Sequence, residues 1–218
     1  MSSPNKKFPL LLLKWWSTYK RDFPWRNTTD PYKILIAELL LRKTTSTQVA
    51  KIYKPLIERY PTPKSLANAC EEELKQMIKS LGMENQRAKI LTEIAKSLCE
   101  RYGGIVPQDL EKLLTLPGVG LYTASAVRCL AYGEREPMVD TNAIRVLQRV
   151  FAYNTNKTRP RTDQHLWELA RSLIPLDNAK HYNLALIDFA SLICRPLKPR
   201  CKKCPVKEIC ANFKKSQP

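Results

Sequence analysis

Residues 109–131 read DLEKLLTLPGVGLYTASAVRCLA. Apolar residues recur at helical spacing on both sides of the turn Pro117–Gly120, so the stretch predicts one helix over Asp109–Leu116 and another that begins near Leu121. Two of the chain's six glycines lie in this turn. Glycine allows a tight turn and lets backbone N–H groups approach a phosphate at the start of a helix. The stretch therefore predicts either an ordinary interhelical turn or a helix–hairpin–helix that holds a DNA backbone without reading its sequence.

The rest of the chain is predicted to be almost wholly helical. Apolar residues recur with a period near 3.6 in further segments bounded by proline or glycine. These segments are Pro9–Tyr19, Lys51–Tyr60, Ser65–Leu81, Arg87–Tyr102, Asn142–Phe151, Asp163–Leu173 and Tyr182–Leu192. We expect Phe23–Arg26 and Asn154–Pro160 to be loops and the basic tail Lys214–Pro218 to be frayed. No strand-like alternation persists, so the predicted fold class is all-α.

The composition of the chain indicates a basic globular protein. Its 218 residues include 37 lysines and arginines against 20 acidic residues, a formal net charge of +17. This excess favours a polyanionic partner, above all nucleic acid, although a basic solvated surface or an anionic membrane would also explain it. A hydrophobic content of 44% predicts a core large enough for one domain or for two small domains that share a groove.

Membrane and secretory segments are not predicted. No run reaches the roughly 20 apolar residues of a membrane span. The run Phe8–Leu13 is short for a secretory signal, and Lys14–Trp16 follows it without a cleavage site. We therefore expect an intracellular protein whose cysteines are metal ligands or buried thiols rather than disulfides. Cys70, Cys99 and Cys129 fall within helical patterns and are expected to be buried.

The other four cysteines have a spacing typical of a soft-metal site. They follow the pattern Cys194-x6-Cys201-x2-Cys204-x5-Cys210. Four thiolates so close in sequence can bind one compact centre, and we expect an iron–sulfur cluster. A structural zinc is the alternative, but zinc sites more often use two paired Cys-x-x-Cys knuckles. Basic residues between the ligands suit phosphate binding, or else compensate the charge of the thiolates. They are Lys198, Arg200, Lys202, Lys203 and Lys207.

Two acidic residues are candidates for catalysis. Asp140 lies two positions before Asn142, at the start of the predicted helix Asn142–Phe151, where aspartate is a favoured N-cap. Capping and catalysis are compatible, because a capping aspartate is ionised and fixed in position. Glu38 lies within the apolar run Ile34–Leu41. If it faces inward, burial disfavours its charged form and suits it to proton donation; otherwise it merely lies on the solvent face of its helix.

These motifs together resemble the endonuclease III branch of the helix-hairpin-helix DNA glycosylases. The resemblance runs from about Pro24 to Cys210, nearly the whole chain. It rests on the hairpin Leu116–Gly120, on Asp140 twenty residues after the last hairpin glycine, and on the spacing of the four cysteines. The three motifs in this order are specific to that family.

The resemblance implies an all-α fold of two helical domains. One is a helix-hairpin-helix six-helix barrel over residues 30–135, and the other is a [4Fe–4S] cluster domain formed by residues 1–29 and 136–218. The implied partner is double-stranded DNA with a mismatched base, bound by a monomer in the cytoplasm or at the nucleoid. The base is flipped into the cleft between the domains, and Arg42 or Lys43 fills the gap. The residues expected to contact DNA are Arg42, Lys43, Gly118, Val119, Gly120 and Thr123.

The resemblance also implies the type of reaction. Bifunctional members of the family have a lysine two positions after the last hairpin glycine, and that lysine forms a Schiff base with the sugar. This chain has Tyr122 there. A phenol cannot form an imine, so we expect a monofunctional glycosylase, without lyase activity, that leaves an abasic site. Asp140 would stabilise the oxocarbenium-like sugar and help direct water, and Glu38 would contact the base.

Two monofunctional branches are alternatives for the substrate. The stretch Glu38–Thr45, with Tyr122 and Asp140, looks more like the Mig-type glycosylases, which remove thymine or uracil opposite guanine. MutY-type adenine glycosylases share Glu38, but they tend to have two glutamines where this chain has Arg42-Lys43. They also usually continue into a further domain, whereas this chain ends eight residues after Cys210. A DNA-binding module without activity and a zinc-stapled scaffold are the non-enzymatic alternatives.

Overall fold

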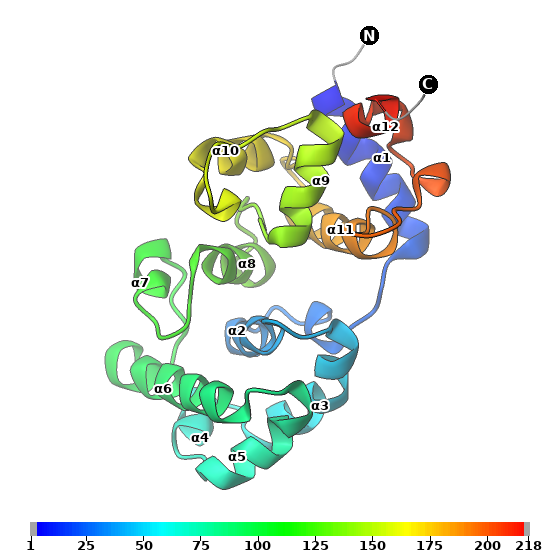
Figure 1. Ribbon diagram of the computed structural model, residues 1–218. Coiled ribbons are helices and arrows are strands. Elements are labelled where there is room, and N and C mark those ends of the chain that lie inside the picture. The colour runs from blue at the N-terminus through cyan, green and yellow to red at the C-terminus, as the bar shows by residue number, and fades with distance from the viewer. Residues whose placement is uncertain (1–3, 216–218) are drawn as a thin grey trace. The chain divides into compact units, whose positions relative to one another are not determined.

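The computed structural model describes residues 4–215. The order of the elements follows the colour from blue to red in Figure 1. Helices and turns account for the regular structure of these residues, which contain no strand, so the predicted all-α class is confirmed. None of the helices within residues 4–215 is long and apolar enough to cross a membrane. The last three residues of the tail that we expected to be frayed lie outside the described residues, whereas Lys214 and Lys215 are helical.

The chain forms two compact units, residues 22–132 and residues 1–21 with 133–218. We expected the divisions after residues 29 and 135. The first lies earlier because Trp25 packs edge-on against Tyr53 of the 22–132 unit, with the ring centroids 5.4 Å apart. The second also lies earlier, because Arg135 belongs with the unit that contains Ile174, to whose carbonyl it donates two hydrogen bonds at 3.0 and 2.7 Å.

The 22–132 unit is built around the nearly apolar helix α2 (Pro31–Leu40). Its other helices are α3 (Ser46–Arg59), α4 (Pro63–Ala67), α5 (Glu71–Ile78), α6 (Glu84–Tyr102), α7 (Leu110–Leu114) and α8 (Leu121–Tyr132), with 3-10 turns η1 (Pro24–Arg26) and η2 (Lys79–Leu81). Helix α2 begins where the Asp30 carboxylate caps the N–H groups of Tyr32 and Lys33. It packs against α8, and α6 packs against α4 and α5.

The prediction of one helix over Ser65–Leu81 is wrong. The chain leaves α4 at Asn68, whose side-chain amide donates to the carbonyl of Lys64 at 3.0 Å. It resumes as α5 after Cys70, which has an extended backbone, and three glutamates occupy the first turn, where the helix dipole favours them. Polar residues at the break therefore outweigh the continuous apolar period.

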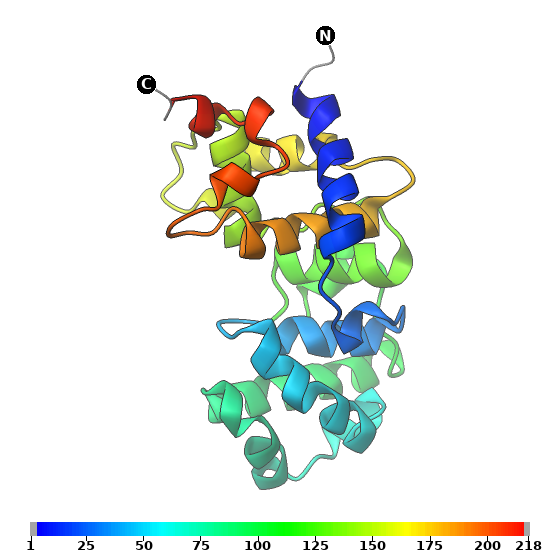
Figure 2. The ribbon, with the colours of Figure 1, turned by 90° about the vertical axis from the view of Figure 1, so that its right-hand side faces the viewer.

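The second unit is organised by α11. Its helices are α1 (Pro4–Tyr19), α9 (Thr141–Phe151), α10 (Gln164–Ser172), α11 (Ala179–Leu192) and α12 (Ala211–Lys215), with 3-10 turns η3 (Pro160–Thr162), η4 (Cys201–Lys203) and η5 (Lys207–Ile209). Helix α11 packs against α9 and against α1, and α1 lies beside it in both Figure 1 and Figure 2. The buried Asp188 of α11 accepts hydrogen bonds from Trp16 at 2.8 Å and from Arg21 at 2.6 Å, which fixes α1 and the residue at its exit.

Candidate functional site

Asp140 is the N-cap of α9. Its Oδ1 accepts a hydrogen bond from the backbone N–H of Ala143 at 2.7 Å, and its Oδ2 accepts one from the side-chain amide of Asn142 at 2.8 Å. The residue is partly buried and its backbone is extended. Both carboxylate oxygens are therefore oriented by donors, and the capping contact is compatible with a fixed negative charge available for chemistry.

A guanidinium continues this arrangement from Asp140 toward α11. Arg145 donates from Nη1 to the side-chain carbonyl of Asn142 at 3.0 Å. Its Nε and Nη2 donate to the backbone carbonyls of Cys194 and Ala190, each at 2.9 Å. Burial lowers the pKa of Arg145, and the neighbouring Cys194 and Asp140 oppose that shift. The orientation of Asp140 is thus linked through two side chains to the end of α11.

Glu38 and the first turn of α8 lie in the 22–132 unit. Glu38 is 4% exposed, so the alternative that it lies on a solvent face is wrong. Its helix packs against α8, which carries the partly buried Tyr122 and the buried Thr123. The Thr123 side chain is 5% exposed, so a DNA contact by this residue has to use its backbone N–H in the first helical turn. The chain thus places Asp140 in one unit and Glu38 and Tyr122 in the other.

The hairpin is a tight turn that requires glycine at one position. Gly118 has φ +73°, and a Cβ there would lie 2.8 Å from Cγ2 of Ile90. Its carbonyl accepts a hydrogen bond from Arg42 at 3.2 Å. Gly120 has neither constraint, because its φ is ordinary and the space around it is open. Glycine at 118 therefore serves the turn, whereas the open space at 120 leaves the backbone before α8 accessible.

A pocket lies between the end of α2 and the start of α6. Arg42 and Lys43 line it together with Met83, Gln86 and Ile90. Lys43 and Met83 both have left-handed backbone conformations, with φ of 55° and 57°, which are uncommon for residues other than glycine. Met83 is 47% exposed. Sequence reasoning missed Met83, because its exposure and its backbone conformation are set by the fold and have no local sequence signal.

One buried arginine holds both edges of this pocket. Arg87 donates to the carbonyls of Leu40 at 3.0 Å, Arg42 at 2.6 Å and Gly82 at 2.8 Å. Burial lowers its pKa, and the nearby charge of Arg42 adds to the shift. Arg87 therefore fixes the main chain on each side of the pocket, at the carbonyls directly before Lys43 and Met83.

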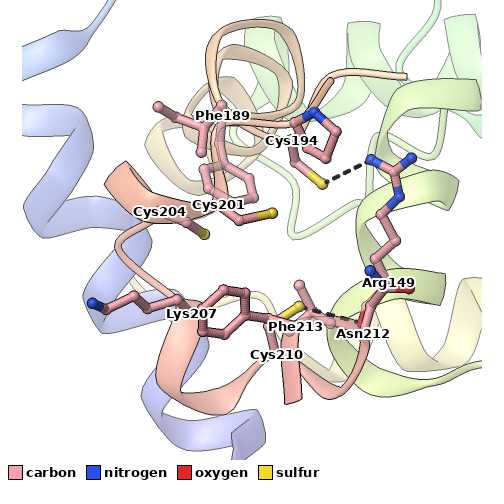
Figure 3. A pocket seen from close by; sticks show the side chains of 12 residues that line it. Arg149, Phe189, Cys194, Cys201, Cys204, Lys207, Cys210, Asn212 and Phe213 are labelled. Atoms are coloured by element: carbon pink, nitrogen blue, oxygen red, sulfur yellow. Dashed lines mark hydrogen bonds between the residues drawn. The ribbon is translucent and has the colours of Figure 1, made fainter. Parts of the chain in front are cut away.

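The four spaced cysteines line one cavity in the other unit. Figure 3 shows the sulfurs of Cys194, Cys201, Cys204 and Cys210 turned toward a common space. Arg149 donates to the Cys194 sulfur at 3.7 Å. Burial raises the pKa of the Cys204 thiol to about 12 and also raises that of Cys194. Within residues 4–215, no three His, Cys, Asp or Glu side chains are placed to hold a metal ion. Four soft donors around one cavity nevertheless fit a thiolate-bound cluster.

The remaining cysteines differ in burial. Cys129 is buried, as predicted, and Cys99 is partly buried. The prediction for Cys70 is wrong, because this residue is exposed. It lies in the break between α4 and α5 rather than on the inner face of a continuous helix.

Comparison with known proteins places the chain in a family. The model of the HhH-GPD superfamily of base excision DNA repair proteins matches residues 36–172. The chain belongs to this superfamily. The match covers the hairpin, Glu38 and Asp140, and the expected resemblance to helix-hairpin-helix DNA glycosylases is confirmed.

Relatives within the HhH-GPD superfamily cover most of the chain. A thymine-DNA glycosylase of Aeropyrum pernix is 48% identical over 93% of this chain and 92% of its own length. A thymine/uracil-DNA glycosylase of Pyrobaculum aerophilum is 44% identical over 97% and 94%. An adenine DNA glycosylase of Mus musculus is 34% identical over 94% of this chain and 42% of its own length.

Solved structures of the superfamily share the fold. A thermostable thymine-DNA glycosylase superimposes with a TM-score of 0.92 over 97% of each chain, at 42% identity. A trapped endonuclease III–DNA complex gives 0.83 over 99% of each chain, at 28% identity. The expected likeness to the endonuclease III fold is therefore confirmed.

Proposed function

We propose that this HhH-GPD protein is a monofunctional DNA glycosylase that removes thymine or uracil opposite guanine and leaves an abasic site. The observation that carries the proposal is the identity of 48% and 44%, along almost the full chain, to thymine and thymine/uracil-DNA glycosylases. The adenine glycosylase is more distant, at 34%. The protein acts as a monomer on chromosomal DNA, in the cytoplasm or at the nucleoid, and its basic charge favours that partner.

In this proposal, Asp140 of one unit and Glu38 and Tyr122 of the other act on the same flipped nucleotide. The oriented carboxylate of Asp140 opposes the positive charge that develops on the sugar and helps direct water to it. A pyrimidine can leave as an anion held by hydrogen bonds, so the buried Glu38 orients the base rather than supplying an obligatory proton. Tyr122 packs beside the base and cannot form the imine that a lyase reaction needs.

The hairpin and the pocket beside it supply the DNA contacts. Open backbone at Gly120 and the first-turn N–H groups of α8 bind a phosphate. Arg42 or Lys43 fills the gap left by the flipped base. Met83 adds an apolar wedge, since exposed methionine is among the side chains that proteins insert between base steps. The shared pocket and the buried Arg87 support a common role for Lys43 and Met83.

The four cysteines hold a [4Fe–4S] cluster in the same proposal. When bound, the cluster supplies an anchor for the basic loop between Cys194 and Cys210 and thereby a rigid phosphate-binding surface. We expect iron and sulfide in protein purified without oxygen, with a yellow-brown colour. Cys201→Ser should lower the yield of folded protein as well as activity. Metal analysis that finds one zinc and no iron would overturn the assignment.

The test of the substrate is a cleavage panel of matched duplexes. Thymine and uracil opposite guanine, adenine opposite guanine or oxidised guanine, and a paired thymine control are incubated with excess enzyme. We expect thymine and uracil opposite guanine to be released fastest, with strand breaks only after alkali. Faster release of adenine would assign the chain to the adenine branch, and a borohydride-trapped adduct would contradict the monofunctional reaction.

A further inference from the structure

Asn183 is a buried amide whose hydrogen bonds point at the segment that leads to Asp140. It lies on α11 and is 1% exposed. Its Oδ1 accepts from the backbone N–H of Met138 at 2.9 Å. Its Nδ2 donates to the backbone carbonyls of Glu136 at 2.9 Å and Ala179 at 3.0 Å. The amide therefore binds the main chain at Met138, only two residues before Asp140.

The Asn183 amide supplies hydrogen-bond partners to residues 133–140, which lack the partners that a helix or a sheet would provide. Residues 133–140 are neither helix nor strand, yet the side chains of Glu136, Met138 and Val139 are buried. Buried backbone donors and acceptors need partners, and a primary amide offers both kinds on one side chain. Asn183 pairs with the main chain here as a neighbouring strand would. An apolar residue at position 183 would leave both backbone groups without this partner.

Asp140 is consequently held against α11 from both directions along the chain. Downstream, the path runs through Asn142 and Arg145 to the carbonyl of Ala190. Upstream, it runs through Met138 to Asn183. The two attachment points on α11 are seven residues apart, about two helical turns, and so lie on one face of the helix. These attachments limit how far the carboxylate can shift from α11.

We propose that Asn183 is a positioning residue for Asp140, fixing the main chain at both Glu136 and Met138 so that the carboxylate meets the reacting sugar. The proposal rests on the proposed function, in which Asp140 stabilises the sugar cation. A catalytic charge must lie close to the position where the sugar cation develops, because a displacement of about 1 Å costs on the order of 100-fold in rate. Loss of the amide should therefore slow bond cleavage while DNA affinity remains.

The experiment compares Asn183→Ala with Trp16→Phe. The control removes the hydrogen bond from Trp16 to Asp188, a partly buried contact to α11 outside the proposed machinery. Melting temperature, affinity for a duplex with a non-cleavable 2′-fluorothymidine opposite guanine, and single-turnover rate with excess enzyme are measured. We expect Asn183→Ala to slow the chemical step by about 10-fold or more with unchanged affinity. Trp16→Phe should keep the wild-type rate at a comparable loss of melting temperature.

A double-mutant cycle separates positioning from general destabilisation. If Asn183 acts through Asp140, Asn183→Ala should have little further effect on rate in an Asp140→Asn background. Equal rates of Asn183→Ala and wild type, or additive losses in the cycle, would overturn the inference. If the alanine variant does not fold, Asn183→Asp serves instead, because it keeps the acceptor for Met138 and loses the donor to Glu136. A wild-type rate for that variant would also overturn it.

The cycle also distinguishes the two proposals. The rates are measured on whichever duplex of the panel the wild-type enzyme cleaves fastest. Wild-type protein that cleaves none of them refutes the proposed function. Active wild-type protein with an undiminished Asn183→Ala variant refutes only the positioning role.

Discussion

The two segments that carry the proposed functional residues are each held by one buried polar side chain, but of different kinds. In the 22–132 unit, the guanidinium of Arg87 holds the chain around Arg42. In the other unit, the amide of Asn183 holds the chain before Asp140. The partners of Arg87 are carbonyls at the end of α2 and at Gly82, whereas Asn183 pairs with both an N–H and a C=O.

The difference follows from which main-chain groups lack partners. The end of a helix leaves carbonyls unpaired and carries partial negative charge, so a cation with several donors suits it. An irregular segment leaves donors and acceptors in alternation, so an amide suits it. The residue type at each buried position is therefore dictated by the backbone it serves, and the two units solve the same problem with different chemistry.

The largest expected effect tests whether Asp140, which lies in one of the two held segments, is catalytic. Asp140→Asn keeps the size and some of the capping ability of the side chain but removes its charge. We expect single-turnover release of thymine to fall by about 100-fold or more, with DNA affinity retained, because the fixed charge opposing the sugar cation is lost.

Asp163→Asn is the matched control for that substitution. Asp163 caps α10 in the same unit with one carboxylate oxygen and accepts from the Tyr153 hydroxyl with the other, as Asp140 does with Ala143 and Asn142. Its variant should keep the wild-type rate. A near-normal rate for Asp140→Asn would restore the interpretation of Asp140 as a cap alone.

The second prediction concerns the guanidinium side of the comparison. Arg87→Lys keeps the charge but cannot reach three carbonyls in a fixed fork, so buried acceptors lose their partners. We expect the free energy of unfolding to fall by about 2 kcal/mol. Arg59→Lys is the control, since Arg59 pairs with Glu73 at the surface and its replacement should cost much less stability. Equal losses in denaturant titrations of the two variants would contradict the role of Arg87.

Local sequence patterns predicted most of the helices and turns. The roles that could not be predicted depend on contacts between residues far apart in the sequence. The hairpin and the Asp140 cap could be predicted from the sequence because each depends on residues only a few positions apart. The break inside Ser65–Leu81 was missed because polar capping at Asn68 outweighs an unbroken apolar period. The separation of Arg87 and Asn183 from the segments they hold is about 45 residues along the chain. No local pattern encodes such partners, so neither residue could be assigned a role from the sequence.

The resemblance to a known family supplied the rest of the site. Asp140 and Glu38 were candidates from their local sequence, and the resemblance added Tyr122 and a role for each. The structure adds that Glu38 is buried and that Asp140 has both oxygens bonded. The four cysteines were found by spacing alone, and the fold brings them to one cavity. Met83 was overlooked, because its left-handed conformation and exposure are properties of the folded chain rather than of its neighbours in sequence.

The smallest effect on stability is expected at Gly120 of the hairpin, where two glycines two residues apart have different tasks. Gly118→Ala should destabilise the protein by about 1–3 kcal/mol, because alanine at φ +73° is strained and its Cβ would meet Ile90. Gly120→Ala should change stability by less than about 0.5 kcal/mol, since φ is ordinary and the space is open.

Gly120→Ala, which should hardly change stability, should nevertheless weaken DNA binding. A methyl group at position 120 keeps a phosphate away from the backbone in front of α8, so affinity for any duplex should fall several-fold, whether or not it contains a mismatch. Denaturant titration and fluorescence anisotropy on paired and mismatched duplexes measure the two quantities. Unchanged affinity of a stable Gly120→Ala variant would mean that the hairpin is only an interhelical turn, and a loss confined to the mismatched duplex would move the contact from the backbone to the bases.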